Sequence, residues 1–164
     1  MIAEVHLHSP TGVATQRQVQ KIVEMLRDSN MLWIAGRVNA GLPVPYCAKA
    51  TGIQYRPPVG QEKQTARQVF RSGPDMFWAG HGSCCDIAPF DASVLTLLYD
   101  IPSRPIVPPQ GGSSFHCNVL TPWGVYDPTM WWDNPKYVLP PLEWGKKLCR
   151  SAVHKLVVEG GARR

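Results

Sequence analysis

Proline restricts the elements that this chain can form more than any other residue type does. The 164 residues include 16 prolines and 14 glycines, and four of the prolines fall between residues 41 and 58. Proline lacks a backbone N–H, and its ring disrupts the interiors of helices and of central strands. The sequence therefore predicts few long helices, many long connections, and irregular structure between residues 41 and 58.

The clearest helical pattern begins near Thr15. Apolar residues follow it at the spacing i, i+3, i+4 and i+7, which places them on one face of a helix. These residues are Val19, Ile22, Val23 and Leu26. The polar run from Asp28 to Asn30 predicts the end of this helix. The apolar run at residues 31–35 fits a helix or a strand equally well.

Weaker patterns along the rest of the chain indicate one domain of the α+β class that spans residues 1–164. Strands are expected at residues 3–7, 106–107 and 115–120, a turn at 121–124, and further helices at 62–71, 87–99 and about 145–164. Gly73 is expected to cap the helix at 62–71, and Pro74 prevents its continuation. The sequence contains no internal repeat and no linker composition that would divide the chain.

Three residue types that act together in covalent catalysis occur in order along the middle of the chain. Cys84 follows a turn of small residues at a predicted helix start, His116 lies on a predicted strand, and Asp127 lies on the next strand. A helix N-terminus and a neighbouring imidazolium both lower the pKa of a thiol, which favours the reactive thiolate. We therefore expect Cys84 to attack a carbonyl, His116 to transfer the proton and Asp127 to orient His116.

The motifs at these positions resemble those of the transglutaminase-like cysteine enzymes. In chain order they are Ile53-Gln54-Tyr55-Arg56, Gly82-Ser83-Cys84-Cys85-Asp86-Ile87-Ala88, Ile101-Pro102-Ser103-Arg104, His116, Gly124 and Asp127-Pro128-Thr129. The resemblance covers residues 52–129, about half of the chain. It implies a papain-like α+β core, in which the nucleophile helix packs on an antiparallel sheet that carries His116 and Asp127.

The same resemblance implies a class of reaction. The family acts on amide bonds through an acyl-thioester, so the resemblance implies a peptide or protein amide as the substrate. Water as the second substrate makes the enzyme a peptidase or amidase, and an amine makes it a transglutaminase-type acyltransferase. The small size of the chain favours hydrolysis, for example of a peptidoglycan stem peptide. Small stand-alone members are frequent in bacteria and their phages, which suggests such a source.

Cys85 is a second candidate nucleophile beside Cys84. The family places an aspartate two residues and an alanine four residues after its cysteine, and this spacing selects Cys84. Pro89 moves the predicted start of the regular helix to about Cys85 or Asp86, or kinks the helix, because proline is unfavourable inside a helix. The residues expected to line the substrate cleft are Trp78, Ser83, Cys85 and Trp123. The two tryptophans fit equally well into a small hydrophobic core.

A zinc site is the alternative for the histidines and cysteines of this region. The residues of suitable type are His81, Cys84, Cys85, His116 and Cys117. The chain has no Cys-x2-Cys pair, and two adjacent cysteines are poorly placed to bind one ion together. We therefore expect neither a metal nor a cofactor.

The positive charge of the chain is concentrated at its C-terminal end. The net charge is +5, and residues 145–164 carry six lysines and arginines against one glutamate. Such a tail forms the solvated face of a helix, or it docks to a protein partner in a larger assembly. A structural or binding component of an assembly such as a phage virion, with the triad secondary, is therefore the second hypothesis. Nucleic acid is not expected as a partner, because no recognition motif accompanies the charge.

Hydropathy and cysteine content bear on where the protein acts. No run approaches the roughly 18 apolar residues of a membrane span. The first residues lack the basic and apolar regions of a signal peptide. Five cysteines, two of them adjacent, do not suggest an even disulfide framework. We therefore expect a cytoplasmic or virion-associated protein with no membrane span and no signal peptide.

Overall fold

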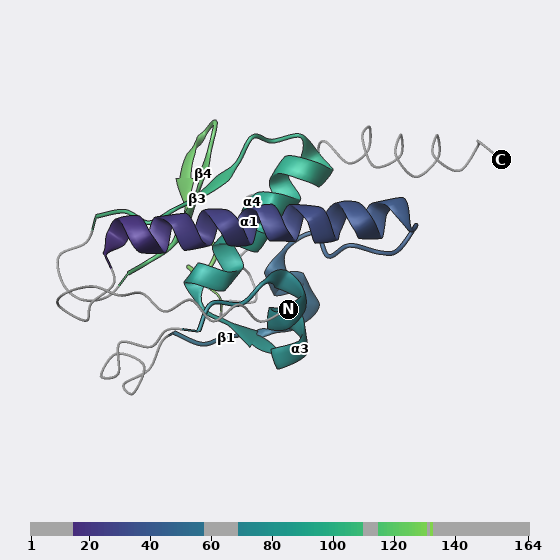
Figure 1. The fold of residues 1–164 in the computed structure, drawn as a ribbon, viewed down its shortest axis with the longest axis horizontal. Helices are drawn as coiled ribbons and strands as arrows, with labels where there is room; N and C mark the ends of the chain where they lie inside the picture. Colours follow the sequence, from purple (N-terminus) through teal and green to yellow (C-terminus); the bar gives the residue numbers. More distant parts are fainter. Residues whose placement is uncertain (1–14, 58–68, 110–114, 131, 133–164) are drawn as a thin grey trace.

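The computed structural model describes residues 15–57, 69–109, 115–130 and 132 (Figure 1). The elements are α1 (Gln16–Asn39), η1 (Ala48–Thr51), β1 (Gln54–Tyr55), α3 (Gly73–Ala79), β2 (His81–Gly82), α4 (Cys84–Tyr99), β3 (Arg104–Ile106), β4 (Asn118–Thr121) and β5 (Gly124–Tyr126). The mixture of helices and small sheets confirms the α+β class. The strand predicted at 3–7 and the basic helix predicted at about 145–164 lie outside the described residues. The single domain predicted for residues 1–164 includes these segments and stays a prediction.

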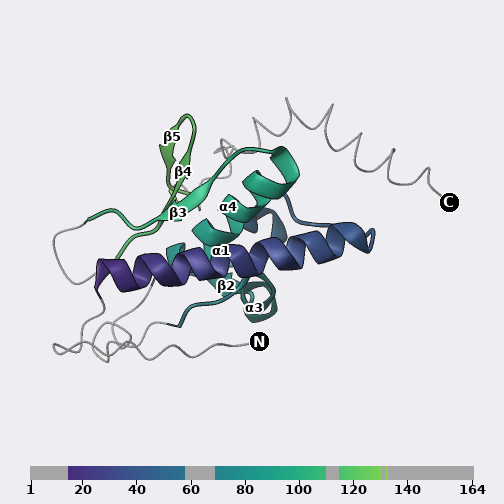
Figure 2. The same cartoon turned by 45° about the horizontal axis from the view of Figure 1, so that its top comes forward.

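Helix α4 forms the centre of the described fold. Every residue from Cys84 to Leu95 is buried, so this helix has no solvent-facing side over its first three turns. Helix α1 packs across it, and strands β3 and β4 contact it as well. Figures 1 and 2 show α1 crossing α4, with the β3–β4–β5 sheet at one end of the pair. A helix that is apolar nearly all round needs such a cover of several neighbouring elements.

Helix α1 begins where the sequence predicts and continues well beyond its predicted end. Thr15 caps it in a capping box with Gln18, which confirms the start. The stop predicted at Asp28 to Asn30 is wrong, because the helix runs through residues 31–35 to Asn39. The Asn30 side chain is fully buried, and its Oδ1 accepts a 2.6 Å hydrogen bond from Gly73 N. Its polar group therefore pairs with another segment and does not end its own helix.

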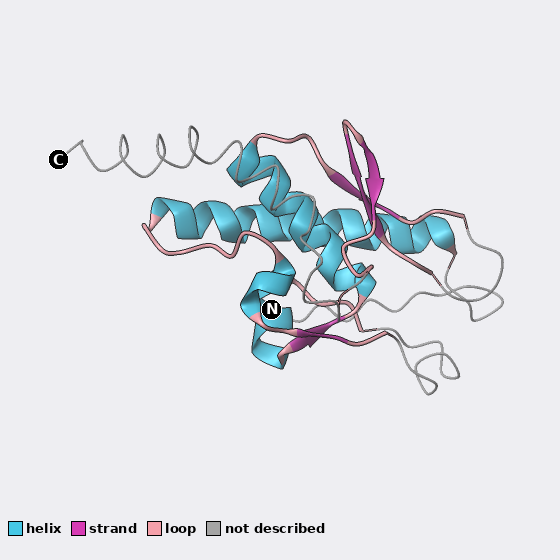
Figure 3. Ribbon diagram, turned by 180° about the vertical axis from the view of Figure 1, so that it is seen from behind, coloured by secondary structure: helices cyan, strands magenta, loops and turns pink. Residues whose placement is uncertain are grey.

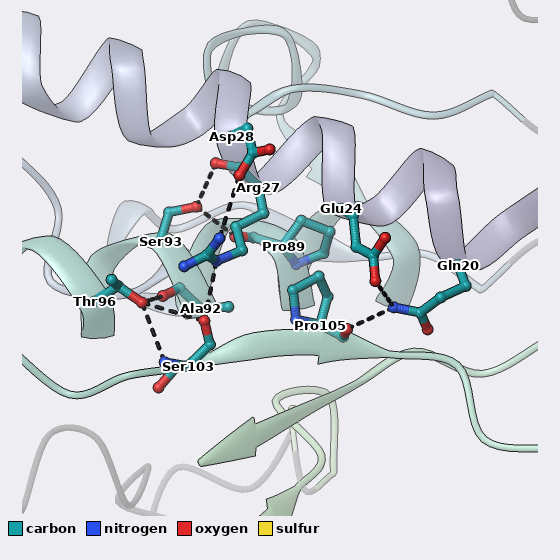
Figure 4. Close-up of polar contacts among 10 residues, drawn as sticks. All are labelled: Gln20, Glu24, Arg27, Asp28, Pro89, Ala92, Ser93, Thr96, Ser103 and Pro105. Atoms are coloured by element: carbon teal, nitrogen blue, oxygen red, sulfur yellow. Dashed lines mark hydrogen bonds and ion pairs between the residues drawn. The ribbon is translucent and has the colours of Figure 1, made fainter. Parts of the chain in front are cut away.

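Side chains of α1 cover the outer edge of β3. Gln20 Nε2 donates to Pro105 O (3.0 Å) and Gln20 Oε1 accepts from Val107 N (2.7 Å), as a neighbouring strand would. Gln16 Nε2 donates to Val107 O (2.6 Å), and Arg27 Nε donates to Ser103 O (3.0 Å). Figure 4 shows Gln20 and Arg27 reaching from the helix to this strand. The helix thereby satisfies backbone groups that an open sheet edge would leave unpaired.

Two small sheets lie at separate places in the fold (Figure 3). The first is an antiparallel sheet of strand order β3–β4–β5, in which the turn predicted at 121–124 joins β4 to β5. Its strands occupy residues 104–106 and 118–121, so the predicted bounds 106–107 and 115–120 are correct only in part. The second is the parallel pair β1–β2, in which Tyr55 lies beside Gly82. The sequence pattern indicates no strand at residues 81–82, because two residues are too few to show alternation.

The helix predicted at residues 62–71 is wrong in its described part, because residues 69–72 are not helical. Gly73 does not cap it. Instead Gly73 is the first residue of α3, and Pro74 lies in the first turn. A backbone N–H at this position would have no acceptor within the helix, so proline costs no helical hydrogen bond there. A Cβ on Gly73 would lie 2.7 Å from Phe90 Cδ2, so α3 approaches α4 closely at this point. Residues 62–68 lie outside the described part.

We predict that Asn30→Ala lowers the free energy of unfolding by about 1–3 kcal/mol, because it leaves the Gly73 N–H buried without an acceptor. Urea unfolding of the full chain measures the loss. Ser29→Ala is the matched control: Ser29 is exposed on the same turn of α1, and its replacement should change stability by no more than about 0.5 kcal/mol. Equal effects of the two substitutions would contradict the bridging role of Asn30.

Candidate active site

Cys84 is the first residue of α4. Ser83 is the N-cap, and its backbone N–H donates to Asp86 Oδ2 at 2.8 Å. The prediction that Pro89 delays the helix start to Cys85 or Asp86 is wrong, because this capping arrangement fixes the start and the helix accommodates Pro89 in its interior. Within this first turn the Asp86 N–H donates to Ser83 O at 3.1 Å. Cys84 lies at the positive end of the α4 dipole, which favours an anion.

Asp86 holds the segments that surround this helix start. Its carboxylate is fully buried, and Oδ1 accepts from Arg71 N at 2.7 Å. Oδ2 accepts from Ser83 N and from Ser83 Oγ (3.0 Å), and the Arg71 guanidinium lies 3.9 Å away. Burial raises the pKa of Asp86, while the hydrogen bonds from Ser83 and Arg71 lower it. The motif that contains Asp86 is visible in the sequence, but this role is visible only in the structure.

His116 and Asp127 are brought together by the β4–β5 hairpin. His116 lies two residues before the start of β4 and Asp127 directly follows β5, so antiparallel pairing of these strands brings the two residues to one end. His116 Nε2 lies 2.6 Å from Asp127 Oδ2. Their side chains are 27% and 26% exposed, so solvent reaches the site from this side. The sequence-based expectation that these two residues form a pair agrees with this geometry.

The ionisation of this pair follows from its contacts. The hydrogen bond with Asp127, followed by that with Cys84, raises the pKa of His116 to about 10. Burial raises the pKa of Asp127, but the hydrogen bonds from His116 and Thr129 outweigh it and leave this pKa below its ordinary value. At neutral pH the two residues therefore form an imidazolium–carboxylate pair, in which Nε2–H donates to Oδ2.

Cys84 and His116 are neighbours that shift each other's pKa: the thiol raises the pKa of His116, and His116 lowers that of Cys84. Because Nε2 of the imidazole faces Asp127, Nδ1 is the ring nitrogen left for the thiol. Cys84 Sγ also lies 4.0 Å from Cys85 Sγ and 4.0 Å from Phe115 O. The three residues that the sequence predicts to act together, Cys84, His116 and Asp127, thus form one continuous chain of contacts.

The resting state of Cys84 differs from the expected thiolate. Contact with Cys85 and burial raise the pKa of Cys84, and the hydrogen bonds with His116 and with the Cys117 backbone lower it by less. Cys84 is only 2% exposed, and a charged sulfur is poorly solvated there. The site therefore rests as a thiol beside an imidazolium, and the lowered thiol pKa expected from the sequence is not found.

The other predicted cleft residues divide into two groups. Ser83 and Cys85 flank Cys84, as their sequence positions require, and Cys85 is fully buried. Trp78 is 94% exposed and Trp123 is 64% exposed, so neither of these side chains belongs to a core. Their assignment as cleft residues stays a prediction.

Tyr55 is a site residue to which sequence reasoning assigned no role. Burial and the proximity of Cys84 raise its pKa, and the neighbouring Thr129 hydroxyl lowers it by less. Its ring packs near Trp132, with centroids 6.1 Å apart. The resemblance to a tyrosine-containing strand was the only signal for it in the sequence.

The structure also bears on a metal site and on a membrane span. Among the described residues, no three His, Cys, Asp or Glu side chains are grouped as metal ligands, so the zinc arrangement of His81, Cys84, Cys85, His116 and Cys117 is not formed. Cys47, Cys84, Cys85 and Cys117 are free thiols. None of the helices in the described ranges is long and apolar enough to cross a membrane.

Comparison with family models, with curated proteins and with solved structures finds no match to this chain. The functional interpretation of the site therefore depends on its geometry and its chemistry.

We predict that Asp127→Asn destabilises the fold in a pH-dependent way. The pKa of His116 is raised from 6.5 to about 10, so the stability from its ion pair is complete below pH 6.5 and is lost as the pH rises through about 10. The pKa of Asp127 is lowered, so its share is present above pH 3.8 and is lost as the pH falls through the lowered value. The gap between wild type and variant should reach about 1–2 kcal/mol near pH 5.5 and shrink towards pH 10.

Chemical denaturation across this pH range measures that gap. Asp28→Asn is the control, because the Asp28 side chain is 71% exposed and should give a small gap. A gap for Asp127→Asn that stays constant from pH 5.5 to pH 10 would contradict the ion pair.

Proposed function

We propose that this protein is a cysteine-dependent enzyme that cleaves or transfers the acyl group of an amide. The observation that carries the proposal is the chain of contacts from Cys84 through His116 to Asp127, built at the N-terminus of a buried helix. A nucleophile, a base within hydrogen-bonding reach and a third group that orients the base are the requirements of covalent acyl transfer.

In the proposed reaction, loss of one proton from the thiol–imidazolium pair leaves a single proton shared between Cys84 and His116. The Cys84 sulfur attacks the amide carbonyl while His116 holds that proton as an imidazolium. His116 then gives the proton to the leaving nitrogen, the C–N bond breaks, and an acyl-thioester remains on Cys84. Asp127 keeps the ring in one orientation and stabilises its positive charge throughout.

The first turn of α4 supplies the electrostatic support for this step. The negative charge of the tetrahedral intermediate develops on the carbonyl oxygen next to Cys84. The positive end of the α4 dipole lies at Cys84 and favours this negative charge. The orientation of the helix start is fixed because Asp86 holds Ser83.

The resemblance to transglutaminase-like enzymes extends the proposal to a papain-like core and to a peptide or protein amide as the substrate. The packing of α4 against β3 and β4, with His116 and Asp127 at one end of the hairpin, supports this extension. Hydrolysis is the preferred reaction, with a peptide such as a peptidoglycan stem as the substrate and the cytoplasm or a virion as the location. Docking through the basic tail falls on residues 145–164, outside the described residues.

Alkylation with iodoacetamide, mapped by mass spectrometry, tests the proposal. Cys84 should label faster than the other cysteines, and its rate should rise between pH 7 and pH 10 as the Cys84–His116 pair loses a proton. His116→Ala should slow labelling at Cys84 by roughly tenfold or more. His81→Ala is the control, because the His81 ring contacts the carbonyl of Ala79 and should leave the rate unchanged.

Two further variants sharpen this experiment. Cys85→Ala removes the sulfur that raises the pKa of Cys84, so labelling of Cys84 near pH 7 should become faster. Cys84→Ala should abolish the fast phase and should not transfer it to Cys85. Slow labelling spread evenly over the five cysteines, or a fast phase at Cys85, would contradict the assignment of Cys84 as the nucleophile.

A further inference from the structure

The carboxylate of Asp127 is held at both of its oxygens. Oδ2 faces His116, and Oδ1 accepts two hydrogen bonds from one residue, Thr129 N at 2.8 Å and Thr129 Oγ1 at 2.7 Å. Such a carboxylate cannot rotate without breaking several charge-assisted hydrogen bonds. Thr129 thus fixes the oxygen that points at the imidazole, although it touches neither Cys84 nor His116 in the described hydrogen bonds.

Both donors of Thr129 are used on this carboxylate. An ionised carboxylate only accepts, so the hydroxyl hydrogen of Thr129 is directed at Asp127 Oδ1. The backbone N–H of Thr129 is directed at the same oxygen. Thr129 therefore holds the carboxylate that faces His116 by its side chain and by its backbone.

The surroundings of Thr129 restrict its movement. Thr129 is buried. Its backbone carbonyl accepts a 3.2 Å hydrogen bond from Trp132 N, and the carbonyl of Asp127 accepts one from Met130 N at 3.3 Å. The turn after β5 is therefore held by its backbone as well as by the Thr129 side chain.

We propose that Thr129 is a positioning residue of this site, whose two hydrogen bonds to Asp127 align His116 with Cys84. The inference deepens the proposed function, because its catalytic consequence rests on that function. In the described hydrogen bonds Thr129 reaches Asp127 and neither Cys84 nor His116, so it acts through Asp127. The arrangement also explains the buried threonine two residues after the aspartate, since its side chain and its backbone hold the same oxygen.

The test compares four full-length proteins: wild type, Thr129→Ser, Thr129→Val and Thr129→Ala. The first readout is the pKa of Asp127, followed by the carboxyl ¹³C chemical shift in NMR. Hydrogen bonds to a carboxylate lower its pKa, so Thr129→Val and Thr129→Ala should each raise the Asp127 pKa by about one pH unit. Thr129→Ser should match wild type because it keeps the hydroxyl.

The second readout is the alkylation rate of Cys84, which should fall several-fold in Thr129→Val and in Thr129→Ala but not in Thr129→Ser. An Asp127 pKa in Thr129→Val equal to that of wild type would overturn the role of Thr129. Thr129→Ala removes the same hydroxyl and decides the question by the same criterion if Thr129→Val does not fold. Slow alkylation of wild-type Cys84 would instead reject the enzyme proposal, while the titration of Asp127 would still decide whether the network exists.

Discussion

The buried carboxylate of Asp86 ties together the segments on which the candidate site depends. It accepts the backbone N–H groups of Ser83 and Arg71 and lies near the Arg71 guanidinium. A carboxylate without such partners would be costly to bury, so the two segments and the helix start stabilise one another. The same hydrogen bonds fix the first residue of α4 as Cys84. The position of the proposed nucleophile thus follows from an interaction that takes no part in the reaction.

Rigid elements carry each member of the triad. Cys84 begins a helix that is buried on all sides, while His116 and Asp127 lie at one end of a paired hairpin that contacts this helix. Helix α1 closes the outer edge of the sheet through its glutamines, which keeps β3 in place against α4. A site assembled from such elements holds its geometry better than one assembled from free loops. The chemistry that it can perform is therefore a property of the core and not of the surface.

The sequence predicts the local features of this fold better than its tertiary contacts. The helix start at Thr15 is visible because capping depends on neighbouring residues. The helix end predicted at Asn30 is wrong because its side chain bonds to a segment far along the chain. The order of the residues suggests the proposed triad. It does not reveal the hydrogen bond from Arg71 N to Asp86, because that bond depends on how the segment before α3 packs against the start of α4, which no local pattern encodes.

The account depends on Cys84 forming a covalent acyl intermediate with the help of His116. Mass spectrometry of the intact protein during reaction with p-nitrophenyl acetate tests this most directly. We predict one acetyl group per chain, formed in a burst on Cys84 and then released as water attacks the thioester, and strongly slowed acetylation in His116→Ala. Acetylation that spreads over the lysines, at the same rate in wild type and in Cys84→Ala, would contradict the account.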